Sequence, residues 1–65
     1  MNWHALTKDM WVSEPYQVIR DINGWSAWIY AEDRSGNLGR SMSLNEAKSI
    51  CEREARDHAL LQTKT

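Results

Sequence analysis

Residues 16–31 read YQVIRDINGWSAWIYA, two runs rich in β-branched and aromatic residues that are joined by Asn23-Gly24. Asn-Gly between such runs favours a type I′ hairpin turn, because both residues accept positive φ at low cost. A two-residue turn at this point fixes the register and sets Ile22 opposite Trp25. The other pairs on this face are then Arg20 with Ala27, Val18 with Ile29 and Tyr16 with Ala31. The face is apolar apart from one arginine, so we expect it to be the core face.

The opposite face of the hairpin is the candidate functional surface. A helix can cover only one face of a small sheet, so the second face should stay open. Ile19, Trp28 and Tyr30 form an apolar cluster on this second face. An uncovered apolar cluster of this kind is typical of a binding site for a partner protein.

The remaining elements follow from local signals. Asn37 to Met42 can supply a third strand. Ser43 and Glu46 have the spacing of a capping box, which predicts that a helix begins at Ser43. An amphipathic apolar stripe then recurs at three- and four-residue steps. The sequence therefore predicts an α+β fold in which a two- to three-stranded antiparallel sheet packs on one C-terminal amphipathic helix. The expected core consists of Tyr16, Val18, Ile22, Trp25, Ile29, Leu38, Leu44, Ala47, Ile50, Cys51 and Leu61.

The segment before the hairpin is expected to be an arm. Trp3, Leu6, Met10 and Trp11 are spaced roughly as one helical face, and Pro15 would end any helix there. We therefore expect at most one helical turn in residues 1–14, a single β-β-β-α domain in residues 15–62 and a frayed tail in residues 63–65. Trp3 or Trp11 of the arm could pack over the apolar cluster, or these tryptophans could contact a partner.

Composition indicates no catalytic chemistry. Cys51 is the only cysteine, so no internal disulfide can form, and no residues have metal-ligand spacing. His58 follows Cys51 by two helical turns, about 10 Å along the axis, whereas a nucleophilic pair must come within roughly 3 Å. We expect Cys51 to be a core residue and the chain to be neither an enzyme nor a cofactor-binding protein. The unpaired thiol and the absence of a long apolar run favour the cytoplasm.

Three binding functions are compatible with these features. The first is protein–protein binding through Ile19, Trp28 and Tyr30, with contributions from Trp11 and Trp3. The second is a homodimer with a structural role that forms through the same face. The third is nucleic-acid binding by the sheet, with Arg20, Arg34, Arg40 and Lys8 as the phosphate contacts. The net charge of −1 and the acidic residues among these arginines make the electrostatic attraction small in the third case.

The sequence resembles small bacteriophage and prophage proteins of unknown function. The resemblance covers roughly residues 11–58. It rests on Tyr16, Trp25-x-Ala27-Trp28, Leu38-Gly39, Ser43-Leu44-x-Glu46-Ala47-Lys48 and Cys51-Glu52. It implies a phage accessory protein, for instance an inhibitor of a host defence protein acting in the host cytoplasm. The order of elements is also similar to the arm-type DNA-binding domain of phage recombinases, but the strands here lack the basic stripe of that domain.

Overall fold

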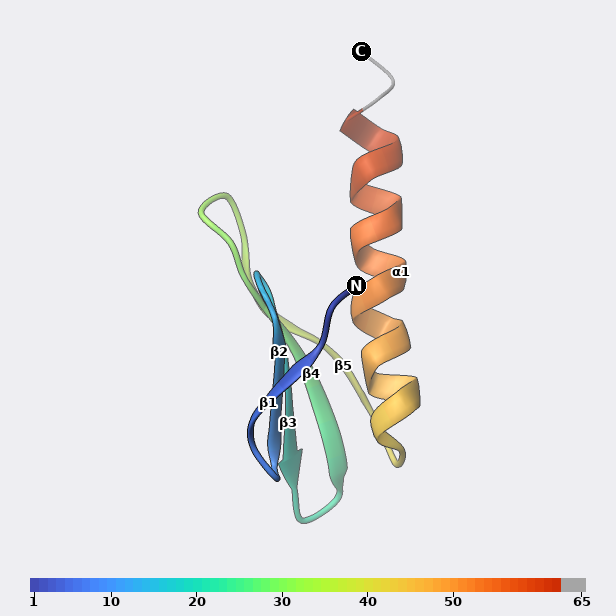
Figure 1. Ribbon diagram of the computed structural model, residues 1–65. Coiled ribbons are helices and arrows are strands. Elements are labelled where there is room, and N and C mark those ends of the chain that lie inside the picture. The colour runs from blue at the N-terminus through green and yellow to red at the C-terminus, as the bar shows by residue number, and fades with distance from the viewer. Residues whose placement is uncertain (63–65) are drawn as a thin grey trace.

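The protein is a two-layer α+β structure in which one helix packs on one face of a sheet (Figure 1). The computed structural model describes residues 1–62. The sheet has five antiparallel strands in the order β1-β2-β3-β4-β5, so the α+β class is confirmed and the expected number of strands was too low. The elements are β1 His4–Thr7, β2 Met10–Ser13, β3 Tyr16–Asp21, β4 Gly24–Tyr30, β5 Ser35–Ser41 and α1 Leu44–Gln62. Residues 63–65, expected to be a frayed tail, lie outside the described residues.

The N-terminal segment forms strands, and the expectation of an arm with a helical turn was wrong. β2 pairs with β3, with Trp11 opposite Val18, and β1 pairs with β2. The Arg20 N–H also donates to the Asp9 carbonyl, at 2.8 Å, which extends the connection beyond β2. Each strand has only four residues, too few to show a clear alternation of apolar and polar side chains. The pairing with β3 supplies the hydrogen bonds that such short strands cannot obtain alone.

The β3–β4 hairpin is shifted by two residues from the expected register. Trp25 lies opposite Arg20, and the two-residue loop consists of Ile22 and Asn23, with Gly24 already in β4. The Asp21 carboxylate accepts the Asn23 N–H at 2.8 Å, which forms an Asx-type turn. This turn moves the two-residue loop from Asn23-Gly24 to Ile22-Asn23. Ile22 is therefore 98% exposed, and its assignment to the core was wrong.

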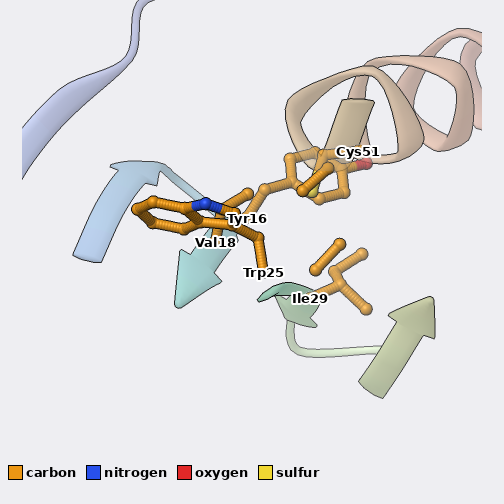
Figure 2. Close-up of a cluster of buried hydrophobic side chains, with 7 residues drawn as sticks. Tyr16, Val18, Trp25, Ile29 and Cys51 are labelled. Atoms are coloured by element: carbon orange, nitrogen blue, oxygen red, sulfur yellow. The ribbon is translucent and has the colours of Figure 1, made fainter. Parts of the chain in front are cut away.

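The shift is even, so it leaves each side chain on its expected face. Tyr16 now lies opposite Ile29, and Val18 lies opposite Ala27. These residues and Trp25 meet α1 in the buried cluster drawn in Figure 2, where the thiol of Cys51 comes from the helix. Leu38, Leu44 and Ile50 pack at the edge of this cluster. The side chain of Leu61, also expected in the core, lies outside the side chains that the structure describes.

The helix lies close to the sheet because the residues between them are small. Ala27, Ala47 and Cys51 are fully buried. A Cβ atom built on Gly39 of β5 would lie 3.4 Å from Cδ1 of Ile50, so α1 also passes close to the backbone of β5. Small side chains at such a contact allow two elements to approach closely.

Ser43 caps the helix as its sequence predicts. Its Oγ accepts the Glu46 N–H at 3.0 Å, and α1 begins at Leu44. The Ser43 N–H donates to Oγ of Ser41 at 3.4 Å, which takes the place that the capping box assigns to the glutamate side chain. A serine cap of this kind contributes about 1 kcal/mol to helix stability.

Candidate protein-binding face

The sheet has an outer face, which points away from α1 and is built from rows of residues that lie opposite one another on adjacent strands. One row runs Met10–Ile19–Ser26 and the next Val12–Gln17–Trp28. On β2, β3 and β4 neither row contains a charged side chain, whereas β5 continues the first row with Arg40 opposite Ser26. Val12 and Ser26 are buried beneath their neighbours, so this face is already well packed before any partner binds.

Ile19, Trp28 and Tyr30 lie on this outer face, and we call these three residues the aromatic patch. The Trp28 and Tyr30 rings are nearly parallel, with an interplanar angle of 12° and centroids 6.2 Å apart. Tyr30 is 51% exposed, while Trp28 and Ile19 are half-buried. Ile19 lies opposite Ser26 and is therefore a diagonal neighbour of Trp28. Two aromatic side chains thus lie next to each other on this face, and Tyr30 is the more exposed of the two.

Trp3 and Trp11 lie on the other side of the sheet, where they contact the helix. The Lys48 ammonium is 4.0 Å from the Trp11 ring centroid and 5.8 Å from that of Trp3. The Trp3 indole N–H donates to Oε2 of Glu52 at 3.1 Å. These cation–π and hydrogen-bond contacts attach the N-terminal strands to α1. The five residues expected to bind a partner therefore do not form one site, and neither tryptophan covers the aromatic patch.

Sequence reasoning missed part of the outer face. Met10 and Val12 of β2 extend the uncharged surface beside Ile19 and Gln17. Beyond them, a shallow groove of about 480 Å³ runs from Tyr30 towards β1 at the end of the sheet where β2 and β3 join. Residues 10–13 show no alternation that marks a strand, because Met10, Trp11 and Val12 are all apolar, and the helical spacing of the neighbouring tryptophans favours a helix.

The basic residues considered for nucleic-acid binding are paired with carboxylates. Arg20 contacts Asp9 at 3.2 Å, Arg34 pairs with Glu54 of α1, and Arg40 pairs with Asp21. Arg20 lies on the helix side, where its guanidinium is 5.8 Å from the Trp25 ring, whereas Arg40 lies on the outer side. Lys8 is exposed in the turn between β1 and β2. These residues do not gather on one surface, which weakens their joint attraction for a phosphate backbone.

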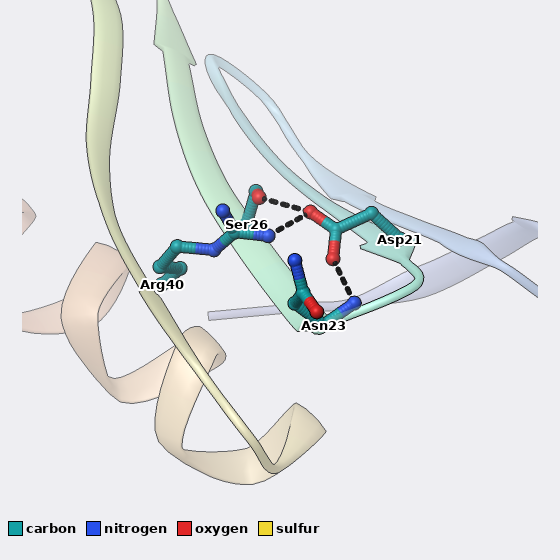
Figure 3. Close-up of polar contacts among 4 residues, drawn as sticks. All are labelled: Asp21, Asn23, Ser26 and Arg40. Atoms are coloured by element: carbon teal, nitrogen blue, oxygen red, sulfur yellow. Dashed lines mark hydrogen bonds and ion pairs between the residues drawn. The ribbon is translucent and has the colours of Figure 1, made fainter.

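Asp21 is the centre of a polar cluster at the other end of the outer face (Figure 3). Its carboxylate accepts the Asn23 N–H at 2.8 Å and the Ser26 hydroxyl at 3.0 Å, and it pairs with Arg40 of β5. The Asn23 N–H is the main cause that lowers the pKa of Asp21. Desolvation is the next largest effect and opposes it, and the Ser26 hydroxyl and Arg40 lower the pKa further by smaller amounts. One carboxylate thus links the β3–β4 turn to β4 and β5.

This cluster predicts a dependence of stability on pH. The pKa of Asp21 is lower in the folded protein than the roughly 3.9 of an unfolded aspartate. The ionised carboxylate therefore contributes its full share to the free energy of unfolding above the unfolded-state pKa. The contribution is lost as the pH falls through the folded-state pKa. We expect Asp21→Asn to lower the free energy of unfolding at neutral pH, and the difference from the parent protein to vanish in acid. Urea titrations across this range measure it, and Glu32→Gln in the exposed β4–β5 turn is the control. A difference that persists unchanged in acid would contradict the assignment.

Cys51 is a buried core residue, as expected, and its environment disfavours nucleophilic chemistry. Burial, with a smaller effect of Glu52, raises the pKa of the thiol to about 11, so the thiol is protonated at neutral pH. Among residues 1–62, no group of three or more His, Cys, Asp or Glu side chains is placed to hold a metal ion. In the same part of the chain, α1 is not apolar enough to cross a bilayer.

No protein-family model, curated protein sequence or solved structure matches this chain. The resemblance to small phage proteins therefore remains a prediction.

Proposed function

We propose that the protein is a small binding module whose partner is another protein that packs on the aromatic patch. The observation that carries this proposal is the stacked pair of Trp28 and Tyr30 on the outer face of the sheet, where the residues opposite Trp28, Gln17 and Asn37, carry no charge. Neither α1 nor the N-terminal tryptophans cover this pair. Tryptophan and tyrosine dominate the binding energy of many protein interfaces, because each buries a large apolar area and keeps one polar group for a hydrogen bond.

The resemblance to phage proteins supports a narrower version of the proposal. In this version the chain is a phage accessory protein in the host cytoplasm, and the partner is a host protein that it inhibits, such as a defence protein. A rigid sheet suits this role, because its contact residues are already ordered and little conformational entropy is lost on binding. Nucleic-acid binding is the weaker alternative, since three of the four candidate cations are paired with carboxylates.

The test uses substitutions in the aromatic patch with a matched control elsewhere. Tyr30→Ser removes the more exposed ring, and Tyr30→Ser combined with Trp28→Ser removes both. We expect the double variant to weaken partner binding at least about 30-fold, the equivalent of about 2 kcal/mol for an interface hot spot. Ile22→Ser is the control, because it removes an even more exposed apolar side chain from the distant β3–β4 turn.

The partner is first captured from host lysate and identified, and its affinity is then measured by calorimetry for every variant. Circular dichroism establishes that each variant is folded. Unchanged affinity in the folded double variant would reject the proposal, as would an equal loss in Ile22→Ser. Sedimentation of the protein alone tests the homodimer: a mass of two chains that returns to one in the double variant would assign the patch to a second copy.

A further inference from the structure

The groove beside the aromatic patch determines what kind of segment a partner would present. It is open along one side and has a volume of about 480 Å³, within the roughly 300–1,000 Å³ of small-ligand clefts. Tyr30 belongs to both the groove and the patch, so one partner can contact both at once. The lining residues are His4, Leu6, Val12, Glu14, Pro15, Tyr16, Gln17 and Tyr30. An open groove of this form suits an extended chain that lies across it.

The lining combines apolar surface with a single carboxylate. Leu6 is 61% exposed, and together with Pro15 it offers apolar contact at the side of β1 and of the β2–β3 turn. Glu14 is the only Asp, Glu, Lys or Arg among the lining residues, and Gln17 adds an amide to the lining. The groove therefore complements an apolar side chain next to a positively charged one.

The surroundings reinforce the negative charge. Glu32 and Asp33 are exposed in the turn that follows Tyr30. The nearby cation, Arg34, pairs with Glu54 of α1 on the opposite side of the sheet, so its charge is already compensated. Tyr30 also has half of its surface accessible, and the face of an aromatic ring attracts a guanidinium group.

We propose that the groove binds an extended segment of the partner protein in which an arginine stands next to an apolar residue. The arginine stacks on Tyr30 and pairs with Glu14, while the apolar side chain lies against Leu6 and Pro15. This inference rests on the proposed function, since the same partner would occupy the aromatic patch. Beyond the proposed function, it specifies that the recognised segment of the partner is extended and positively charged.

The probe is a capped hexapeptide of alternating leucine and arginine, titrated to about 1 mM against isotope-labelled protein and followed by NMR. Two matched peptides carry glutamine or glutamate in place of arginine. We expect the arginine peptide to shift the amide signals of Gln17 and Tyr30 and the indole signal of Trp28. The glutamine peptide should bind about tenfold more weakly, and the glutamate peptide more weakly still.

Two variants locate the charge. Glu14→Gln should weaken the arginine peptide about threefold, as expected for a pair at the rim of a site. Glu46→Gln removes an exposed carboxylate from the first turn of α1 and should leave the affinity unchanged. The inference is overturned if the arginine peptide causes no shifts, if the glutamine peptide binds equally well, or if both variants behave alike. If capture of the partner still depended on Trp28 and Tyr30, the proposed function would stand. Only the preference for a segment with an arginine would then be rejected.

Discussion

Trp25→Ala is expected to leave most of the protein unfolded at physiological temperature. Trp25 is only 9% exposed and belongs to the buried cluster between the sheet and α1. Truncation of a buried tryptophan costs about 3–5 kcal/mol. The core of a domain of this size supplies only about 3–5 kcal/mol in total, so little stability would remain. Urea titration followed by circular dichroism, in the cold and on warming, measures the loss.

Ile22→Ala is the matched control for this prediction. The expected turn at Asn23-Gly24 would bury Ile22 opposite Trp25, whereas the observed register leaves Ile22 98% exposed. We therefore expect Ile22→Ala to change the free energy of unfolding by no more than about 0.5 kcal/mol. A loss of several kcal/mol in this variant would contradict the observed register and favour the one that the turn motif alone predicts.

Gly24→Ala is expected to be the second strongly destabilising change. The φ angle of Gly24 is +127°, and a Cβ atom there would lie 2.4 Å from the carbonyl oxygen of Ser41. The methyl group would force apart the ends of β4 and β5, next to the cap of α1 at Ser43. We expect backbone strain to lower the free energy of unfolding by about 1–3 kcal/mol and the clash to lower it by about 2 kcal/mol more.

Gly36→Ala separates these two contributions. Gly36 has a comparable φ of +146°, but a Cβ atom there would meet nothing within 4 Å. This variant should therefore carry the cost of backbone strain alone. Thermal and urea denaturation of both variants give the difference. Equal losses at the two glycines would show that the close approach of Ser41 to Gly24 has no energetic consequence.

The candidate site was predicted in part because a strand's side chains alternate between its faces. Alternation assigns Ile19, Trp28 and Tyr30 to one face in any register shifted by an even number of residues. The prediction therefore survived the displaced turn. The separate groove was not predictable, because its lining comes from β1, β2, β3 and β4, which are brought together only by the complete sheet.

The tryptophans of the N-terminal segment show the opposite case. Their spacing along the chain fits a helix as well as it fits two short strands. The choice depends on hydrogen bonds to β3 and on Lys48 and Glu52, which lie far away in the sequence on α1. A pattern within fourteen residues contains no information about such partners, so Trp3 and Trp11 were assigned to a surface that they do not reach.

The sequence by itself determined the α+β class, the start of α1 at its Ser43 cap, the burial of Cys51 and the faces of the hairpin. These features depend on groups a few residues apart, whose interactions a periodicity or a capping pattern records directly. Only the tertiary structure decided the register of the β3–β4 hairpin and the number of strands. It also decided which arginines are compensated by carboxylates. Asp21 illustrates the reason: it holds the turn through Asn23, yet it also pairs with Arg40 on β5, a contact that exists only once the sheet has formed.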